Sequence, residues 1–493
     1  MKRKDTDMKI RILSLILTLG LLLSTLAGCG TESGTSHTGS AERPAQTGST
    51  TQTDSNNVPG EPSSENTTSG ENHSLYPTSD YSGFEMPEAT ERLTVYAYSF
   101  ISSFLTPAVE RFKEEYPGIQ VDYQILGDDE YQTRLRAEIP AGKGPDVLIG
   151  DDVLLPDIYK TMSTGILSDL GGFMVKDEEF DSKDYYEGVI KGGRMFGKQY
   201  LLPLACNVKC FVTTIELLEK NGLDLNTMSS WEGFYEACQV FHEKNPGSAL
   251  FAHNATQWYY LPTLYTGMGF RMIDYERGEV SFDEEQFRQM VDLCRLYCNP
   301  DMPPEFKFGE EYTAVHNGEC FFASGQTKVF NILYAVCDSM RYYYEETPVI
   351  MTIPDGEGGS TAGIEYYGAI PEASNNKLNA WRFLKILLSD ELQYGERIGD
   401  EQFKTYYPTG IPVRKESFRH QLNDIVELYE MSTEDADMLF DVTEHISDAV
   451  MLPSVIRGYV SQYMNSYITS KDGSNYDKVF AKLKSTLELY KDE

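Results

Sequence analysis

Polar and aromatic side chains follow two apolar segments in the first part of the chain, where they could hold a small molecule. Tyr98, Ser99 and Phe100 follow the first segment, and Asp151 and Asp152 follow a later one. Carboxylates accept hydrogen bonds from vicinal hydroxyls, and aromatic faces cover the apolar C–H side of a sugar ring. These residue types favour a hydroxyl-rich ligand, although the two aspartates could instead cap a solvated helix.

Alternation of apolar and polar residues, and its change to helical spacing, predicts the elements that would position these side chains. The predicted order is strand (93–98), helix (107–116), strand (119–123), helix (131–139) and strand (146–150). This alternation is typical of parallel strands in an α/β fold. Ligands of open parallel sheets bind beyond the carboxyl ends of the strands, where Tyr98 and Asp151 are expected.

The rest of the chain continues with mixed elements and no internal repeat. An extended run through Thr213 contains Cys206 and Cys210, which are too far apart along a strand, at roughly 13 Å, to form a disulfide. Later predicted helices are 215–221, 231–244, 287–297, 379–388 and 476–489, and later predicted strands are 321–325, 349–353 and 364–370. The cysteines lie among large apolar neighbours, so we expect buried thiols.

The N-terminus carries an export signal. Basic residues precede an apolar run over residues 12–26, which is shorter than the roughly 20 residues of a membrane span. The run ends in Leu26-Ala27-Gly28-Cys29, which resembles the lipobox of bacterial lipoproteins. We therefore expect a signal peptide (1–28) and lipidation of Cys29, which would hold the protein on the extracellular face of the cytoplasmic membrane. A plain signal peptide is the alternative.

A polar segment separates this signal from the folded chain. Residues 29–88 are rich in Ser, Thr, Gly, Pro, Asn and Glu and nearly devoid of apolar residues. Such a segment buries too little surface to offset chain entropy, so it is predicted to be a disordered tether. A tether of this composition reaches roughly 40–45 Å.

Charge and motifs exclude several classes of function. The net charge of −34, from 76 acidic and 42 basic side chains, argues against nucleic-acid ligands. HExxH and Cys/His spacings are absent from the sequence, so no metal and no cofactor is expected. Catalytic motifs are also absent, although the many acidic pairs leave a glycosidase open.

Five short motifs occur in an order that resembles bacterial extracellular solute-binding proteins of family 1, the maltose-binding-protein-like receptors of ABC importers. The motifs are F-K-E-E-Y-P-G-I-Q-V (112–121), G-P-D-V (144–147), G-K-Q-Y-L-L-P (197–203), G-E-C-F-F-A-S-G (318–325) and N-A-W-R-F-L-K (379–385). The resemblance implies a type II periplasmic-binding-protein-like fold, α/β in class, with a ligand cleft between two lobes. It implies lobe 1 over 89–204 plus 365–404, and lobe 2 over 205–364 plus 405–493.

The resemblance also implies further ligand-facing residues. Asn207 would lie at the first crossover between the lobes, and Glu365 and Tyr366 at the second. Asn254, Trp258 and Tyr259 correspond to an aromatic-bearing cleft segment, and Ser324 precedes another expected contact. Trp258 could instead be a core aromatic. Tyr366 and Tyr367 alternate along a strand, so only one of them is expected to face the cleft.

The implied function is a lipid-anchored receptor that captures a sugar or oligosaccharide by lobe closure and delivers it to ABC transporter permease subunits. The resemblance implies that the protein is not an enzyme. A receptor for a non-sugar solute, such as a peptide or polyamine, is the first alternative. A secreted carbohydrate-active enzyme is the second.

Overall fold

The computed structural model describes residues 76–151, 155, 157–252, 261, 264–297, 311–326, 330–355, 359–398, 402–404, 406, 410–429, 431–470 and 472–493. All of them belong to one compact unit, Ser74–Glu493. The predicted signal peptide, Cys29 and most of the predicted tether lie outside the described residues.

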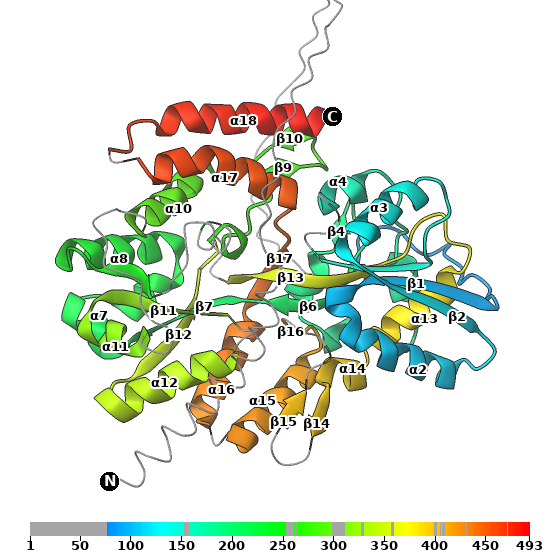
Figure 1. The fold of residues 1–493 in the computed structure, drawn as a ribbon, viewed down its shortest axis with the longest axis horizontal. Helices are drawn as coiled ribbons and strands as arrows, with labels where there is room; N and C mark the ends of the chain where they lie inside the picture. The colour runs from blue at the N-terminus through cyan, green and yellow to red at the C-terminus, as the bar shows by residue number, and fades with distance from the viewer. Residues whose placement is uncertain are drawn as a thin grey trace, which may run out of the picture. The chain divides into compact units, whose positions relative to one another are not determined.

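The larger sheet is built from seven described strands. In Figure 1 it runs from the centre of the view, where β17 and β13 lie, to β1 and β2 on the right, beside α2 and α13. The seven strands are β1 (Arg92–Tyr98), β2 (Gln120–Leu126), β3 (Val147–Gly150), β6 (Leu202–Asn207), β13 (Ser360–Ala369), β16 (Ile411–Pro412) and β17 (Ile446–Val450). Their order is β16-β6-β13-β3-β1-β2, and β17 pairs with β13. β1 runs parallel to β2 and β3, as the strand–helix alternation predicted, and β13 runs antiparallel to β3 and β6.

Helices between these strands cover the sheet with their apolar faces. α2 (Leu105–Glu115) buries Leu105, Ala108, Val109 and Phe112 and overlaps the predicted helix 107–116. α13 (Lys377–Leu387) packs against α2, with the Phe112 and Phe383 ring centroids 5.8 Å apart. The remaining helices of this part are α3 (Asp128–Glu138), α4 (Ile158–Ser163), α5 (Gly171–Lys176), α6 (Glu187–Lys191) and α14 (Asp390–Tyr394).

The smaller sheet has four described strands in the order β12-β7-β11-β8. They are β7 (Lys209–Thr214), β8 (Ala249–Ala252), β11 (Cys320–Gln326) and β12 (Pro348–Thr352). Phe211 and Phe322 contact each other across it, with ring centroids 5.5 Å apart. The other described helices of the chain are α7 (Ile215–Asn221), α8 (Trp231–Lys244), α10 (Glu284–Tyr297), α11 (Glu311–Asn317), α12 (Phe330–Tyr344), α15 (Lys415–Tyr429), α16 (Thr433–Glu444), α17 (Ser454–Ile468) and α18 (Tyr476–Asp492).

Three two-stranded sheets complete the described strands, and two of them are short hairpins. The hairpins are β4 (Arg194–Met195) with β5 (Lys198–Gln199), and β9 (Ile273–Asp274) with β10 (Glu279–Val280). A further pair is formed by β14 (Glu396–Ile398) and β15 (Gln402–Lys404). Among the described helices, none combines the length and apolar composition that a bilayer-spanning segment requires.

The chain passes from one sheet to the other at Val208, where β6 ends and β7 begins. It returns through β13, whose first residues pair with β17 and whose later residues pair with β6 and β3. The register between β13 and β6 shifts on both sides of Tyr366, so Glu365 is an extra residue in a β-bulge. Bulges interrupt the regular alternation of a strand and re-aim side chains.

A segment ahead of β1 packs against α5. The Tyr81 hydroxyl donates to both carboxylate oxygens of Asp169, at 3.0 and 2.9 Å. The Phe84 ring packs edge-on against Phe173, with centroids 5.1 Å apart. Packed chain therefore begins before residue 89, where the sequence placed the start of the first lobe.

The six described cysteines, Cys206, Cys210, Cys238, Cys294, Cys320 and Cys337, are buried and form no disulfide. This confirms the prediction that Cys206 and Cys210 are not bridged and that thiols serve as small apolar side chains. Cys298 lies outside the described residues.

Candidate functional site

Tyr98 and Asp151 form a direct contact at the carboxyl ends of β1 and β3. The Tyr98 hydroxyl donates to Oδ2 of Asp151 at 2.6 Å. Burial and the nearby Asp151 carboxylate raise the pKa of Tyr98, so the phenol stays protonated and remains a donor. The parallel β1–β3 register brings these two strand ends together, as the sequence predicted.

Asn207 and Glu365 form a second contact where the chain crosses between the sheets. Asn207 ends β6 and is 1% exposed, and its Nδ2 group donates to Oε1 of Glu365. Glu365 is the bulged residue of β13, which turns its side chain toward the end of β6. The Glu365 carboxylate also adds to the effect of burial in raising the pKa of the neighbouring Cys206 thiol.

Tyr366 connects the two contacts along β13. Its hydroxyl lies close enough to Tyr98 to contribute to the raised pKa of Tyr98, as does the carboxylate of Asp128 at the start of α3. Both Tyr366 and Tyr367 are buried, at 2% and 0% exposed. We call Tyr98, Asp151, Asn207, Glu365 and Tyr366 the crossover cluster.

The other predicted residues do not extend this cluster within the described chain. Ser99 begins the 3-10 helix Ser99–Phe104, and its side chain is exposed. Phe100 lies in the same helix, and Ser324 lies in β11, paired with Phe211; their side chains are outside the described part. Asp152, Asn254, Trp258 and Tyr259 lie outside the described residues.

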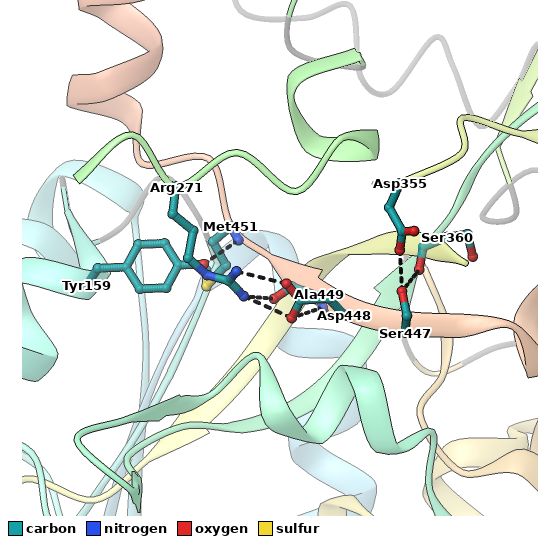
Figure 2. A network of polar contacts seen from close by, with 8 residues as sticks. All are labelled: Tyr159, Arg271, Asp355, Ser360, Ser447, Asp448, Ala449 and Met451. Atoms are coloured by element: carbon teal, nitrogen blue, oxygen red, sulfur yellow. Dashed lines mark hydrogen bonds and ion pairs between the residues drawn. The ribbon is translucent and has the colours of Figure 1, made fainter. Parts of the chain in front are cut away.

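A polar network beside the crossover was not found from the sequence. Figure 2 shows the Arg271 guanidinium pointing at β17, where it pairs with both oxygens of Asp448 at 2.8 and 2.9 Å. It also donates to the carbonyl of Ala449 at 3.1 Å. The Tyr159 hydroxyl of α4 accepts from the Met451 amide at 3.0 Å. These residues come from segments that are far apart in the sequence, so no local motif predicts that they lie together.

The same network continues at the other end of β17. The Ser447 hydroxyl donates to Asp355 and to the carbonyl of Ser360, which begins β13 (Figure 2). These contacts fasten β17 to the strand that carries Glu365 and Tyr366. The network therefore holds the first residues of β13, the strand that carries two members of the crossover cluster.

The crossover cluster gathers hydrogen-bonding groups of several kinds. Its members offer carboxylate and amide oxygens, which accept, and phenols, which donate and accept. Within the described ranges, no group of three or more His, Cys, Asp and Glu side chains is arranged to hold a metal ion. These groups are of the kinds that pair with hydroxyl or amino groups beside aromatic rings.

The family model for bacterial extracellular solute-binding proteins matches residues 99–291 of this chain. The resemblance to this family is confirmed. The match begins directly after Tyr98 and spans Asp151 and Asn207, so it covers part of the crossover cluster.

Individual relatives agree with the family match. A carbohydrate ABC transporter substrate-binding protein of Streptococcus pneumoniae is 28% identical over 146 residues, which is 28% of each chain. The sugar-binding protein MalE of Xanthomonas citri superposes with a TM-score of 0.58 at 15% identity, covering 81% of this chain and 97% of the other. UgpB of Mycobacterium tuberculosis, solved in complex with glycerophosphocholine, has a TM-score of 0.50 at 17% identity, covering 82% and 99%.

These structural likenesses show the fold. The chain has the two-lobed α/β fold of type II periplasmic binding proteins, as the resemblance implied. The alignment with the pneumococcal protein covers only 28% of that protein's own length.

Proposed function

We propose that this solute-binding protein is the lipid-anchored receptor of an ABC importer and captures a sugar or oligosaccharide without chemical conversion. Two lobes, 89–204 plus 365–404 and 205–364 plus 405–493, would close on the ligand. Closure is favoured by ligand because only the closed form contacts it from both sides. The captured solute would pass to permease subunits in the membrane that holds Cys29.

The crossover cluster is the observation that carries this proposal. It joins strand ends of the larger sheet to the crossover strands β6 and β13, through Tyr98–Asp151 and Asn207–Glu365. In the proposed receptor these residues would contact the ligand, and their contacts would change when the two sheets move relative to each other. Carbohydrate-binding relatives in sequence and in fold support a sugar as the solute.

A non-sugar solute is the second candidate. The mycobacterial structure of the same fold holds glycerophosphocholine, so this fold accommodates other hydroxyl-bearing molecules.

A thermal-shift screen over mono- and oligosaccharides, glycerophosphocholine, peptides and polyamines tests the proposal. A ligand at 100 times its dissociation constant adds about 2.7 kcal/mol to the free energy of unfolding. A shift with a sugar that is recovered unchanged after incubation supports the receptor. Hydrolysis of the sugar, or shifts with non-sugar solutes alone, contradicts it.

A further inference from the structure

The Asn207 amide has a defined orientation. Its Nδ2 group donates to Glu365, and a carboxylate can only accept, so the carbonyl oxygen cannot take that place. The side chain is 1% exposed, and its Oδ1 atom has no hydrogen-bond partner among the described residues. Because Glu365 takes the Nδ2 group, the atom of Asn207 that could pair with a ligand is Oδ1, which is an acceptor.

An unpaired buried carbonyl oxygen is costly, because it has lost its water and gained no donor. A ligand hydroxyl or amino group placed there supplies the missing donor. A ligand carboxylate or phosphate brings further lone pairs and a negative charge instead. The Asn207 Oδ1 atom therefore distinguishes between the two kinds of ligand group.

Nearby carboxylates also disfavour an anionic ligand group. Asp151 accepts from Tyr98, and the carboxylates of Asp151 and Asp128 contribute to raising the pKa of Tyr98. Glu365 contributes to raising the pKa of Cys206. Burial is the largest cause of both raised pKa values, and the carboxylates add to it through their negative charge.

We propose that the crossover cluster selects ligands by the sign of their polar groups. The ligand group beside Asn207 is a hydrogen-bond donor, a neutral hydroxyl or an amino group, and a carboxylate or phosphate is rejected there. Glu365 acts as a positioning residue that holds the Asn207 amide in this orientation. The inference rests on the proposed function, since it takes these residues as ligand contacts.

Calorimetric titration with glucose, glucosamine and glucuronate, and with the matching galactose series, tests this selection. Each series keeps the sugar ring and replaces one neutral group, either by an amino group, which can carry a positive charge, or by a carboxylate, which carries a negative charge. We expect the uronate to bind about tenfold or more weakly than the neutral sugar, given the cost of an unpaired buried acceptor. Uronate binding that equals or exceeds neutral binding overturns the inference.

Substitutions separate selection from a structural role. Glu365→Gln keeps the shape but allows the Asn207 amide to turn, so the preference for neutral sugar over uronate should fall several-fold. Glu110→Gln removes the same charge from an exposed position on α2 and should leave the preference unchanged. An equal effect of both substitutions, or a uniform loss of all ligands with Glu365→Gln, overturns the inference.

Putrescine, titrated in the same way, distinguishes this inference from the proposed function. Binding of putrescine without any sugar overturns the sugar assignment and retains selection by sign. A preference for glucuronate retains the sugar assignment and overturns selection by sign. Binding of none of these probes overturns both.

Discussion

Asp338 lies on α12 beside the ion pair of Arg341 and Asp435. Arg341 contacts both oxygens of the fully buried Asp435 at 2.6 Å. Burial, and then repulsion by Asp435, raise the pKa of Asp338 to about 6, against an opposing effect of Arg341. Above this pH an ionised Asp338 lies next to a carboxylate that already has its partner.

The raised pKa has a defined consequence for stability. The folded state holds the Asp338 proton more tightly than the unfolded state, whose ordinary value is 3.8. Stability from this group is therefore largest below pH 3.8 and is lost as pH rises to about 6.

Asp338→Asn should therefore stabilise the protein at pH 8 and have little effect at pH 4. The side chain is 44% exposed, so solvent screening limits the gain to about 1 kcal/mol or less. Denaturant unfolding at both pH values measures it. Asp437→Asn, at a side chain that is 77% exposed, is the control, and an equal effect of the two substitutions contradicts the prediction.

Residues 76–91 form a strap across α5, and the two glycines that begin this helix explain how. A Cβ on Gly172 would lie 2.3 Å from the Phe84 ring, and one on Gly171 would lie 2.2 Å from the Tyr81 hydroxyl. The glycines thus let aromatic rings lie directly on the helix backbone. Ser79 also donates its amide to the carbonyl of Gly197 in the β4–β5 turn, at 3.1 Å.

Gly172→Ala should displace the strap and lower the free energy of unfolding by about 1–3 kcal/mol, through overpacking against Phe84. Hydrogen exchange over residues 76–91 should rise at the same time. Gly458→Ala, on an exposed face of α17 with open space around its Cβ position, should instead stabilise by about 0.5–1 kcal/mol. An unchanged exchange rate in the strap would show that Phe84 accommodates the methyl group.

At the scale of the whole molecule, α4 and the residue before it contact segments that lie more than 100 residues later in the chain. The Tyr275 hydroxyl, after β9, donates to Oδ2 of the buried Asp157 at 2.6 Å. Lys160 of α4 donates to the carbonyl of Tyr490 at 2.9 Å and lies 4.3 Å from the centre of its ring. Figure 1 shows the C-terminal end of α18 beside α4, in agreement with these contacts.

Tyr275→Phe should lower the free energy of unfolding by about 1–3 kcal/mol, because a buried carboxylate loses a hydrogen bond. Hydrogen exchange should increase in both α4 and the β9–β10 hairpin. Tyr123→Phe, at an exposed position of β2, should be neutral. Equal stabilities of the two variants would mean that the Tyr275 contact contributes nothing net.

The proposed membrane anchor depends on one atom, the Cys29 sulfur. Cys29→Ala should move the protein from the membrane fraction to the medium, because it removes the site of lipidation. The sequence after the predicted signal peptide has no apolar run of the roughly 20 residues that could span the membrane instead. Immunoblots of cell fractions measure this, and Ser33→Ala is the control. Retention of the Cys29→Ala protein on membranes contradicts lipidation as the means of attachment.

Regular elements could be predicted from the sequence because their signals are local. The helices 215–221 and 231–244 match α7 and α8 residue for residue, and each has a Ser or Thr cap, Thr214 and Ser230. The parallel placement of β1 and β3 also brought Tyr98 to Asp151 as expected.

Features that depend on distant pairing could not be predicted. The bulge at Glu365 exists only through its register with β6, more than 150 residues earlier, and no local signal marks it. The insertion of β17 beside β13 and the approach of Arg271 to Asp448 have the same origin. The strap was assigned to the tether because it has few apolar residues, and two of them, Tyr81 and Phe84, pack against α5, which lies far along the chain.

The buried thiols make this protein suited to an optical reporter. Burial raises the pKa of Cys206, Cys210, Cys238, Cys320 and Cys337. Cys294 is buried as well, so maleimides should leave all six thiols unmodified in the folded state. In a chain that starts after Cys29 and carries Cys298→Ser, an added Ser99→Cys would be the reactive thiol. A solvent-sensitive dye at this exposed position, next to Tyr98, would turn solute capture into a change of fluorescence.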